Sequence, residues 1–375
     1  MKDIFDNRYF YINKFLMSFI GQWPFHSARR NFVIQCFIVF SISSFFIVLI
    51  GGVIQVRHNT SKMMEGFPLI FTAFNSFVYF IVCSFKRNML FRLFNDIKCN
   101  LEFWSSEKEQ LIILHHVNNG RILTIYCTGI LIITTILFIS TSLTPQILNI
   151  VLPLNESRPK KFPFQVYYNV DCPEDYFYFI TVHLISIGII IVFIIIGAES
   201  VFSVLTEHAC ALFKIVSLQL QKIDPTESET ENLKVLVLCI EHHKRAIDPY
   251  FLLMLVAYSA FIAVCLIEIV LNLNNIETFL RSVATLSTGL IYIFLNSFMV
   301  QRFMDYSTAL SDTIYQGNWY EMSLKIRKIL LLIMMRSRIP CKVTCGKMRD
   351  LTLINVSSLL QTSFSSFTLL MSVTS

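Results

Sequence analysis

The sequence predicts an all-α membrane protein with seven transmembrane helices, a cytoplasmic N-terminus and an extracellular C-terminus. The first observation is composition, because 54% of the 375 residues are hydrophobic and 15% are charged. The second is a set of seven apolar runs, each close to the roughly 17 to 25 residues that a helix needs to cross a bilayer. The third is the distribution of basic residues, which sets the orientation. The runs cover residues 32–54, 67–84, 122–141, 176–203, 251–273, 279–300 and 351–371.

Basic residues lie mostly on one side of these runs. The N-terminal arm and the connections 85–121, 204–250 and 301–350 together hold 25 of the 31 Lys and Arg residues, and the remaining connections hold 6. An excess of Lys and Arg marks the cytoplasmic side of a membrane protein. We therefore expect the N-terminus inside, which is opposite to the orientation of a G-protein-coupled receptor.

Two glycosylation sequons fall on the predicted outer side. Asn59 lies in the 55–66 connection and Asn155 lies in the 142–175 connection. Because an occupied sequon marks a surface loop outside the cytoplasm, both positions agree with the charge distribution. A third sequon, at Asn355, lies within the last apolar run and is expected to stay unmodified.

The chain is expected to form a single seven-helix membrane domain over residues 1–375, with 301–350 as a cytoplasmic assembly and anchor region. Apolar residues recur at near-helical spacing around Leu310, so the cytoplasmic connections are expected to continue the spans as helical extensions. The 142–175 connection contains five prolines, the first of them Pro145. Proline disfavours a helix interior, so we expect an irregular lid over the outer helix ends.

Titratable side chains form no catalytic or metal-binding pattern in the sequence. Paired His or carboxylate clusters, a Gly-rich phosphate loop and a Ser/His/Asp set are all missing at plausible membrane depth, so we expect neither an enzyme nor a cofactor or metal. The net charge of +6 comes from basic residues beside the spans. It indicates a solvated rim next to membrane lipid and no nucleic-acid partner.

Three ionisable residues lie within the spans. Glu199 and Glu268 are close enough to helix ends to be expected at the interface, where they would reach water. His183 lies in the outer half of the fourth run, and either a hydrogen bond to a neighbouring helix or contact with a ligand would explain it.

The seventh run carries a stripe that is polar in its predicted cytoplasmic half and apolar at its outer end. Such a stripe is typical of a channel with a wet vestibule and a hydrophobic constriction that gates by dewetting. Ordinary packing through small hydroxylated residues is the alternative. The stripe consists of residues three or four positions apart, which share one helix face: Asn355, Ser358, Thr362, Ser366, Leu369 and Val373.

The last 60 residues contain the most specific segments of the chain. They read YQGNWY at 315–320, RKILLLIM at 327–334, RSRIP at 336–340 and TSFSSFTLL at 362–370. In order and spacing these segments resemble the C-terminal region of insect odorant receptors. Phe364 departs from the usual pattern, where tyrosine is frequent.

This resemblance implies a subunit of a ligand-gated, non-selective cation channel. The 204–250 connection is short, which implies an odorant-tuning subunit that forms a heterotetramer with the olfactory co-receptor in the plasma membrane of olfactory sensory neurons. Leu369 and Val373 match the family's gate positions, and Ser358 matches a pore-lining position, with Thr362 and Ser366 on the same stripe. A gustatory-type receptor channel and a G-protein-coupled chemoreceptor are the alternatives.

The resemblance also implies a ligand site in the outer half of the membrane, between the second, third, fourth and sixth helices. The matching stretches are rich in aromatic and aliphatic side chains, which suits a small, volatile, largely apolar molecule held by dispersion and a hydrogen bond. Each residue could instead face lipid or pack between helices. The candidates are Phe71, Phe74, Asn75, Phe77, Val78, Thr134, Thr135, Phe138, His183, Ser186, Ile187, Thr285, Leu286 and Gly289.

Overall fold

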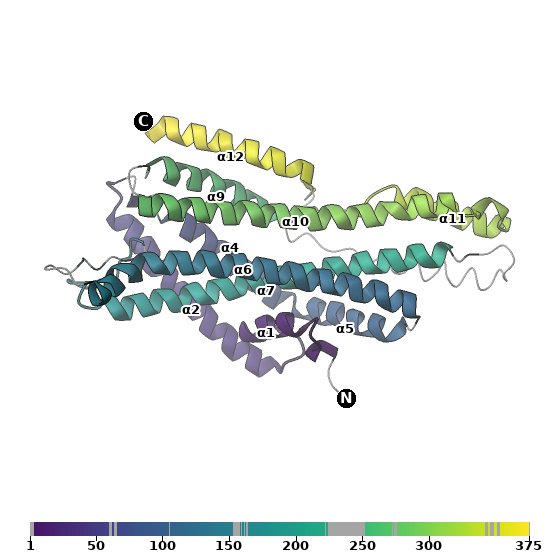
Figure 1. Cartoon of the computed structure of the whole chain (residues 1–375), viewed down its shortest axis with the longest axis horizontal. Coiled ribbons are helices and arrows are strands. Elements are labelled where there is room, and N and C mark those ends of the chain that lie inside the picture. The colour runs from purple at the N-terminus through teal and green to yellow at the C-terminus, as the bar shows by residue number, and fades with distance from the viewer. Residues whose placement is uncertain are drawn as a thin grey trace.

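Long helices make up most of the chain in the computed structural model (Figure 1). The structure describes residues 4–59, 62–63, 66–104, 106–152, 158, 160, 162, 164–221, 223, 252–271, 273, 276–341, 344–345, 349–350 and 353–374. In chain order the elements are η1 (Ile4–Asp6), α1 (Tyr11–Phe19), α2 (Ala28–Gln55), α4 (Phe67–Phe85), α5 (Arg87–Phe103), α6 (Glu107–Val151), α7 (Phe177–Gln221), α9 (Leu252–Leu271), α10 (Ile276–Gln316), η2 (Trp319–Glu321), α11 (Leu324–Ser337), β1 (Thr344–Cys345), β2 (Arg349–Asp350) and α12 (Leu353–Thr374).

The seven predicted apolar runs lie on seven helices: α2, α4, α6, α7, α9, α10 and α12. By length and composition, α2, α4, α6, α7 and α10 are apolar enough to cross a membrane, and the described side chains of α9 form a shorter apolar stretch, Phe261–Leu271. The predicted all-helical membrane fold is therefore confirmed. Which side faces the cytoplasm stays a prediction.

Three helices continue well past their apolar runs. α6 begins at Glu107, α7 ends at Gln221 and α10 ends at Gln316. At 3.6 residues per turn, these continuations add roughly four to five turns each, as the sequence predicts. We call the continuations, residues 107–121, 204–221 and 301–316, together with the N-terminal arm, α5, η2 and α11, the extension half. The seven apolar runs and the 142–175 connection form the span half.

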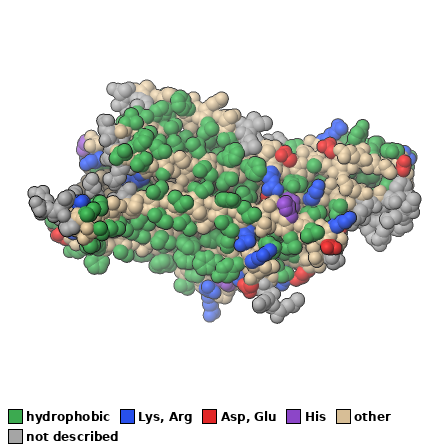
Figure 2. Space-filling model, viewed as in Figure 1, with side chains coloured by type: hydrophobic (Ala, Val, Ile, Leu, Met, Phe, Trp, Pro, Cys, Tyr) green, Lys and Arg blue, Asp and Glu red, His purple; other side chains and the backbone are tan. Residues whose placement is uncertain are grey.

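The two halves differ on the surface as well. Figure 2 shows hydrophobic side chains covering the left of the molecule, over the span half. Most Lys, Arg, Asp and Glu side chains on this face lie to the right, over the extension half, and a few lie at the left end. A surface that is apolar around the spans is what contact with lipid requires.

α7 is the central helix of the bundle. It packs against α6, α10, α4, α1 and α2. Its 45 residues contain no proline and include long runs of Ile and Val, so nearly every face of the helix is apolar. A helix that is apolar all round is stable only when neighbours or lipid surround it.

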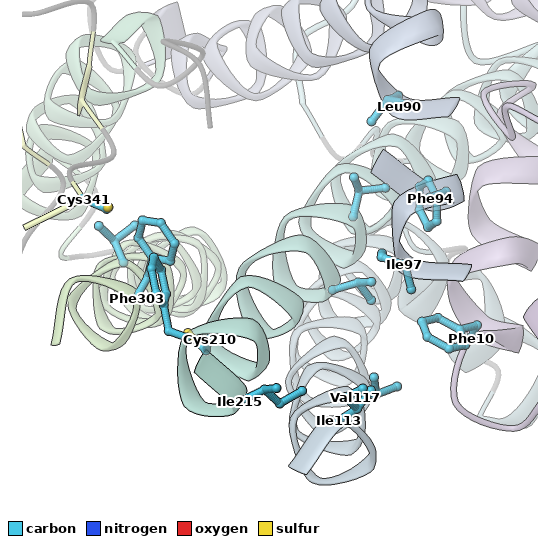
Figure 3. Close-up of a cluster of buried hydrophobic side chains, with 14 of the residues drawn as sticks. Phe10, Leu90, Phe94, Ile97, Ile113, Val117, Cys210, Ile215, Phe303 and Cys341 are labelled. Atoms are coloured by element: carbon cyan, nitrogen blue, oxygen red, sulfur yellow. The ribbon is translucent and has the colours of Figure 1, made fainter. Parts of the chain in front are cut away.

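A large apolar core fills the extension half and continues into the adjoining part of the spans, where it includes Ile42 and Ile194. Leu90, Phe94 and Ile97 of α5 are spaced four and three residues apart, so they share one face, and all three are buried. They belong to the same buried cluster as Ile113 and Val117 of α6 (Figure 3). α5 is thus held by an apolar stripe, although its opposite face is polar.

The N-terminal arm belongs to this core. Phe5 and Trp23 are 1% exposed, and their rings meet edge to face with centroids 5.3 Å apart. Trp23 also contacts Phe94, with centroids 5.1 Å apart. Asn13 of α1 donates to the backbone oxygen of Ser200 in α7 over 3.1 Å. These contacts anchor the arm beneath the bundle.

The predicted apolar stripe of the 301–350 connection is largely buried, but it lies on two helices. Leu310 and Ile314 lie on α10 and Ile326 lies on α11, and all three are at most 3% exposed, whereas Ile329 and Ile333 of α11 are half-buried. The chain turns between them at η2. The stripe packs against the end of α7, including Phe213, in the same core as α5.

The expectation that proline excludes a long helix from 142–175 is wrong for its first ten residues. α6 continues through Pro145 to Val151. Proline removes one backbone hydrogen bond and strains the preceding turn. At Pro145 only six residues of helix follow, and local adjustment in a membrane-spanning helix can satisfy the freed carbonyl.

The expectation that Glu199 and Glu268 reach water is also wrong, since both are 4% exposed. Glu199 lies where α7 is covered by α4 and α10, and its carboxylate receives two side-chain hydrogen bonds, from Tyr79 and Asn296. The position of Glu199 near the end of an apolar run does not indicate which neighbouring helices cover it.

The last helix follows a short antiparallel pair in which Thr344 is opposite Asp350. α12 packs on α9 and α10 through one face, where Leu359 and Ser363 are buried. Leu359 joins a cluster with Phe261 and Ile293. The opposite face of α12 is exposed in the single chain.

Candidate ligand-binding cavity

A cavity of about 220 Å³ lies in the span half, among α4, α6, α7 and α10. Aromatic and aliphatic side chains form most of its wall, with six threonines among them. The lining residues are Phe45, Leu69, Thr72, Asn75, Tyr79, Leu131, Thr134, Thr135, Phe138, Ile139, Ser142, Phe164, Thr181, Leu184, Ile185, Gly188, Ile191, Val192, Ile195, Phe261, Thr285, Thr288, Gly289 and Tyr292.

Small side chains on the lining helices leave this space open. At Gly188 of α7, an added Cβ would find no atom within 4 Å. At Gly289 of α10, an added Cβ would lie 2.6 Å from the Phe261 ring, so this glycine lets α9 and α10 approach closely. Gly188 therefore borders open space in the cavity, whereas Gly289 allows α9 and α10 to pack closely beside it.

Six of the fourteen predicted ligand residues line the cavity. They come from α4, α6 and α10: Asn75, Thr134, Thr135, Phe138, Thr285 and Gly289. The other eight are not among its lining residues. Phe71 and Leu286 pack against the cluster around Phe261, and Phe77 packs against the extension-half core. Phe74 and Ser186 are exposed, Ile187 is buried in an adjacent cluster, and Val78 is half-buried.

His183 bonds to neighbouring protein groups. Its Nδ1 lies 2.6 Å from the Tyr168 hydroxyl, and its Nε2 lies 3.3 Å from the Ser44 hydroxyl. Ser44 already donates to the backbone oxygen of Ser41, so it can only accept from Nε2. Burial raises the pKa of Tyr168 to about 12, which keeps its proton available for Nδ1. Of the two sequence interpretations, the structural bond is the one seen here.

Residues 164–168, which we call the lid segment, close one side of the cavity. The Tyr167 backbone N–H donates to the oxygen of Val48 over 3.2 Å. Phe164 contacts Phe45 and Phe138, with both pairs of ring centroids 6.0 Å apart. Within the predicted lid, residues 164–172 are irregular, as proline content predicts.

A buried polar cluster lies behind the cavity wall. Tyr79, which lines the cavity, donates to Glu199 over 3.4 Å, and Asn296 donates to the same carboxylate oxygen over 3.2 Å. Glu199 does not line the cavity itself, and Tyr79 connects its carboxylate to the cavity wall. Hydrogen bonds of this kind lower the cost of burying a carboxyl group.

The cavity itself presents no charged side chain among the described residues that line it. Arg281 contacts one lining residue from outside the lining, with its guanidinium 5.3 Å from the centroid of the Phe138 ring. Within the described residues, His, Cys, Asp and Glu side chains form no group that could hold a metal ion. The site is therefore suited to a neutral, mostly apolar molecule.

The residues of α7 that line the cavity were missed by sequence reasoning. Thr181, Leu184, Ile185 and Gly188 are spaced three, one and three residues apart, so they share one face of α7. His183, Ser186 and Ile187 lie on a different face. The fourth run is apolar around its circumference, so only the helical spacing from Thr181 could have indicated the face, and nothing local marks that spacing as special.

The predicted pore stripe lies mainly on the exposed face of α12. Leu369 is 67% exposed, Thr362 is exposed, and Ser358 and Ser366 are half-buried. The side chains of Asn355 and Val373 lie outside the described residues. Of the two predicted glycosylation sites, Asn59 is exposed and Asn155 lies outside the described residues. Pore lining and glycosylation stay predictions.

Comparison with known proteins identifies the family. The 7tm Odorant receptor family model matches residues 59–364, which is most of the chain. The chain belongs to the odorant receptor family. This membership favours an odorant receptor over the gustatory-type alternative. Proteins of this family are receptors and not enzymes.

Curated relatives match over shorter stretches of this odorant receptor. Odorant receptor 10 of Aedes albopictus is 32% identical over 38% of the chain. Odorant receptor 67c of Drosophila melanogaster is 22% identical over 46% of the chain. The matched stretches span 40% and 45% of those two relatives, less than half of each.

A solved structure shares the whole fold. The olfactory receptor OR5 of Machilis hrabei, in complex with eugenol, aligns over 98% of this chain and all of its own, with a TM-score of 0.76 and 13% identity. The same receptor without that ligand aligns equally well, with a TM-score of 0.76 and 14% identity. At this identity the likeness concerns the fold alone.

Proposed function

We propose that this odorant receptor binds a small, neutral, volatile molecule in the 220 Å³ cavity and opens a cation pore in response. The observation that carries the proposal is the cavity itself, because it lies among the helices where the family resemblance implies a ligand site. OR5, which has the same fold, is described in complex with eugenol. Six predicted ligand residues line the space.

The pore belongs to α12. Its stripe of Ser358, Thr362, Ser366 and Leu369 is largely uncovered in the single chain, whereas its Leu359 face packs inward. Hydroxyl-bearing and aliphatic side chains on an uncovered helix face suit a pore assembled from several subunits. The absence of charged residues on the stripe favours weak selectivity among cations.

The remaining subunits include the olfactory co-receptor in a heterotetramer, as the family resemblance implies. The N-terminus lies in the cytoplasm and the C-terminus outside, in the plasma membrane of an olfactory sensory neuron. The extension half, with its basic 301–350 connection, lies on the cytoplasmic side and holds the subunits together. The charge distribution supports this orientation.

The test is electrophysiology of cells that express this chain with and without the co-receptor. Odorant-evoked currents should require both subunits. Thr135→Trp should fill the cavity and abolish the evoked currents with surface expression preserved. Ile132→Trp is the matched control, because Ile132 lies on the same helix, is 46% exposed and does not line the cavity. Currents that require GTP would contradict the channel, and equal currents in the two variants would contradict the site.

A further inference from the structure

The threonines of the cavity differ in what their hydroxyl groups do. In five of the six, the hydroxyl lies 2.7 to 2.9 Å from the backbone oxygen four residues earlier in its own helix. These five are Thr72, Thr134, Thr135, Thr285 and Thr288. The hydroxyls of Thr134 and Thr288 also lie 2.7 Å apart, so one of these two donates to the other. Their protons are therefore occupied, and their oxygens remain able only to accept.

Thr181 is the exception. Its side chain lines the cavity and is 5% exposed, and its hydroxyl has no hydrogen-bond partner among the described residues. A buried hydroxyl without a partner has lost its water without compensation, which is costly for the free protein. A group that accepts a hydrogen bond inside the cavity would remove this cost.

The lack of charged side chains in the described cavity lining indicates which kinds of acceptor group the ligand can carry. The described lining residues include no Asp, Glu, Lys, Arg or His. A carboxylate or ammonium ligand would lose its hydration with no counter-charge at the wall, which is strongly unfavourable. A neutral acceptor such as a ketone, aldehyde or ester oxygen has no such cost.

The volume sets the size. One water occupies about 30 Å³ in the liquid, so a cavity of about 220 Å³ has the volume of about seven waters, and it suits a ligand of fewer than about ten non-hydrogen atoms. An aliphatic body of that size would contact the Leu184, Ile185 and Ile191 side chains, which line the same face of α7 as Thr181.

We propose that Thr181 is the specificity-determining hydrogen-bond donor of this receptor, and that its ligands are small neutral carbonyl compounds. The inference rests on the proposed function only in taking the cavity as the ligand site. Thr181 donates its proton to the carbonyl oxygen, and the apolar wall holds the remainder of the molecule. Alcohols are recognised less selectively, because the five other hydroxyl oxygens can accept from them.

The test measures binding directly, without gating. The purified full chain in lipid nanodiscs is titrated with 2-octanone and with 2-methyl-1-octene, which replaces the carbonyl oxygen by a methylene group. Thr181→Val removes the donor and keeps the shape. We expect the dissociation constant for 2-octanone to rise about 3- to 10-fold and that for the alkene to change by less than about 2-fold. Thr181→Ser should restore 2-octanone binding.

Matched variants separate the inference from its alternatives. Thr128→Val makes the same change on α6 outside the cavity lining, where the hydroxyl donates to the oxygen of Thr124 over 2.7 Å, and should alter neither constant. If Thr181→Val weakens both probes equally, or if Asn75→Leu and not Thr181→Val removes the preference for the ketone, the inference is wrong.

Failure of the proposed function has a different signature. Thr181-dependent binding of 2-octanone without evoked currents would leave the donor assignment intact and contradict the channel. Wild-type protein that binds only the alkene would contradict the donor assignment alone. Protein that binds neither probe would contradict both the assignment and the cavity as a ligand site.

Discussion

The helices α6, α7 and α10 run through both halves of the molecule, yet they pack differently in each. In the extension half they present Val117, Phe213 and Phe303 to a filled core, and the rings of Phe213 and Phe303 lie 5.6 Å apart. In the span half the same helices present threonines and glycines, and a cavity of about 220 Å³ remains.

Two buried polar sites, one in each half, also differ. In the extension half, Glu207 pairs with His116 over 2.8 Å and with Arg302, so the buried charges are matched. In the span half, Thr181 is buried with its hydroxyl unpartnered among the described residues. A filled region with a paired ionic cluster holds the fold together, whereas an open cavity whose lining includes an unpartnered hydroxyl is suited to a ligand. Substitutions in the two halves should therefore affect stability and ligand binding differently.

The largest effect is expected from Glu207→Ala in the extension half. Glu207 is 1% exposed and His116 is 2% exposed, so the change leaves a buried ionic cluster without its carboxylate. We expect a loss of about 3 kcal/mol in the free energy of unfolding, the lower end of the usual range, because Arg302 keeps 23% exposure to water. Thermal unfolding of purified protein measures it. Asp312→Ala removes an exposed carboxylate from the same α10 extension and should cost under about 0.5 kcal/mol; equal losses would refute a structural role for the cluster.

A smaller loss is expected where the lid segment meets α2. A Cβ at Gly52 would overlap the backbone carbonyl of Gln165 and lie 3.0 Å from the Cα of Val166. Gly52→Ala should therefore displace the lid segment and destabilise the span half by roughly 1 to 3 kcal/mol. Unfolding temperature and proteolysis of the segment measure this. At Gly129 an added Cβ meets nothing within 4 Å, so Gly129→Ala is the control and should not destabilise. A lid that is cleaved at the wild-type rate in Gly52→Ala would contradict the packing.

Gly188→Ala should change stability in the opposite direction. The added methyl group enters open space in the cavity, and alanine favours a helix by about 0.8 to 1 kcal/mol over glycine. We expect a stabilised protein that binds larger ligands less well than smaller ones. Unfolding temperature and a series of ligands of increasing length provide the measurement. Gly129→Ala should be stabilised similarly with no change in ligand size preference, and a shared change in preference would argue against the cavity as the site.

The smallest effect is a pH dependence in the N-terminal arm. Burial, together with the nearby charges of Arg30 and Lys14, lowers the pKa of His26 from its usual value. Below about pH 6.5 the unfolded chain therefore binds a proton before the folded protein does, and stability falls as pH falls from 7 to 5. His26→Gln should reduce that slope in unfolding experiments across this range. An unchanged slope would show that His26 does not contribute to it.

Much of the fold could be predicted from the sequence because it depends on local composition. Apolar runs of spanning length and the periodic residues from Leu310 to Ile333 are recognisable without knowing any neighbour. Pro145 shows the limit of such reasoning, since its preference to end a helix is overridden in α6. Asn75 and Thr134 were found through the family resemblance, whereas Thr181 was not.

By itself, the sequence determined an all-helical membrane protein built on long apolar helices, the continuation of three of these helices into the extension half, and membership of the odorant receptor family. Each depends on hydropathy, periodicity or motif order along the chain. Only the tertiary structure decided which face of α7 borders the cavity, that Glu199 is buried, and that the lid segment packs against Gly52. α7 is apolar on nearly every side, so its own residues do not specify an orientation. The helices packed around it decide that Thr181, and not His183, borders the cavity.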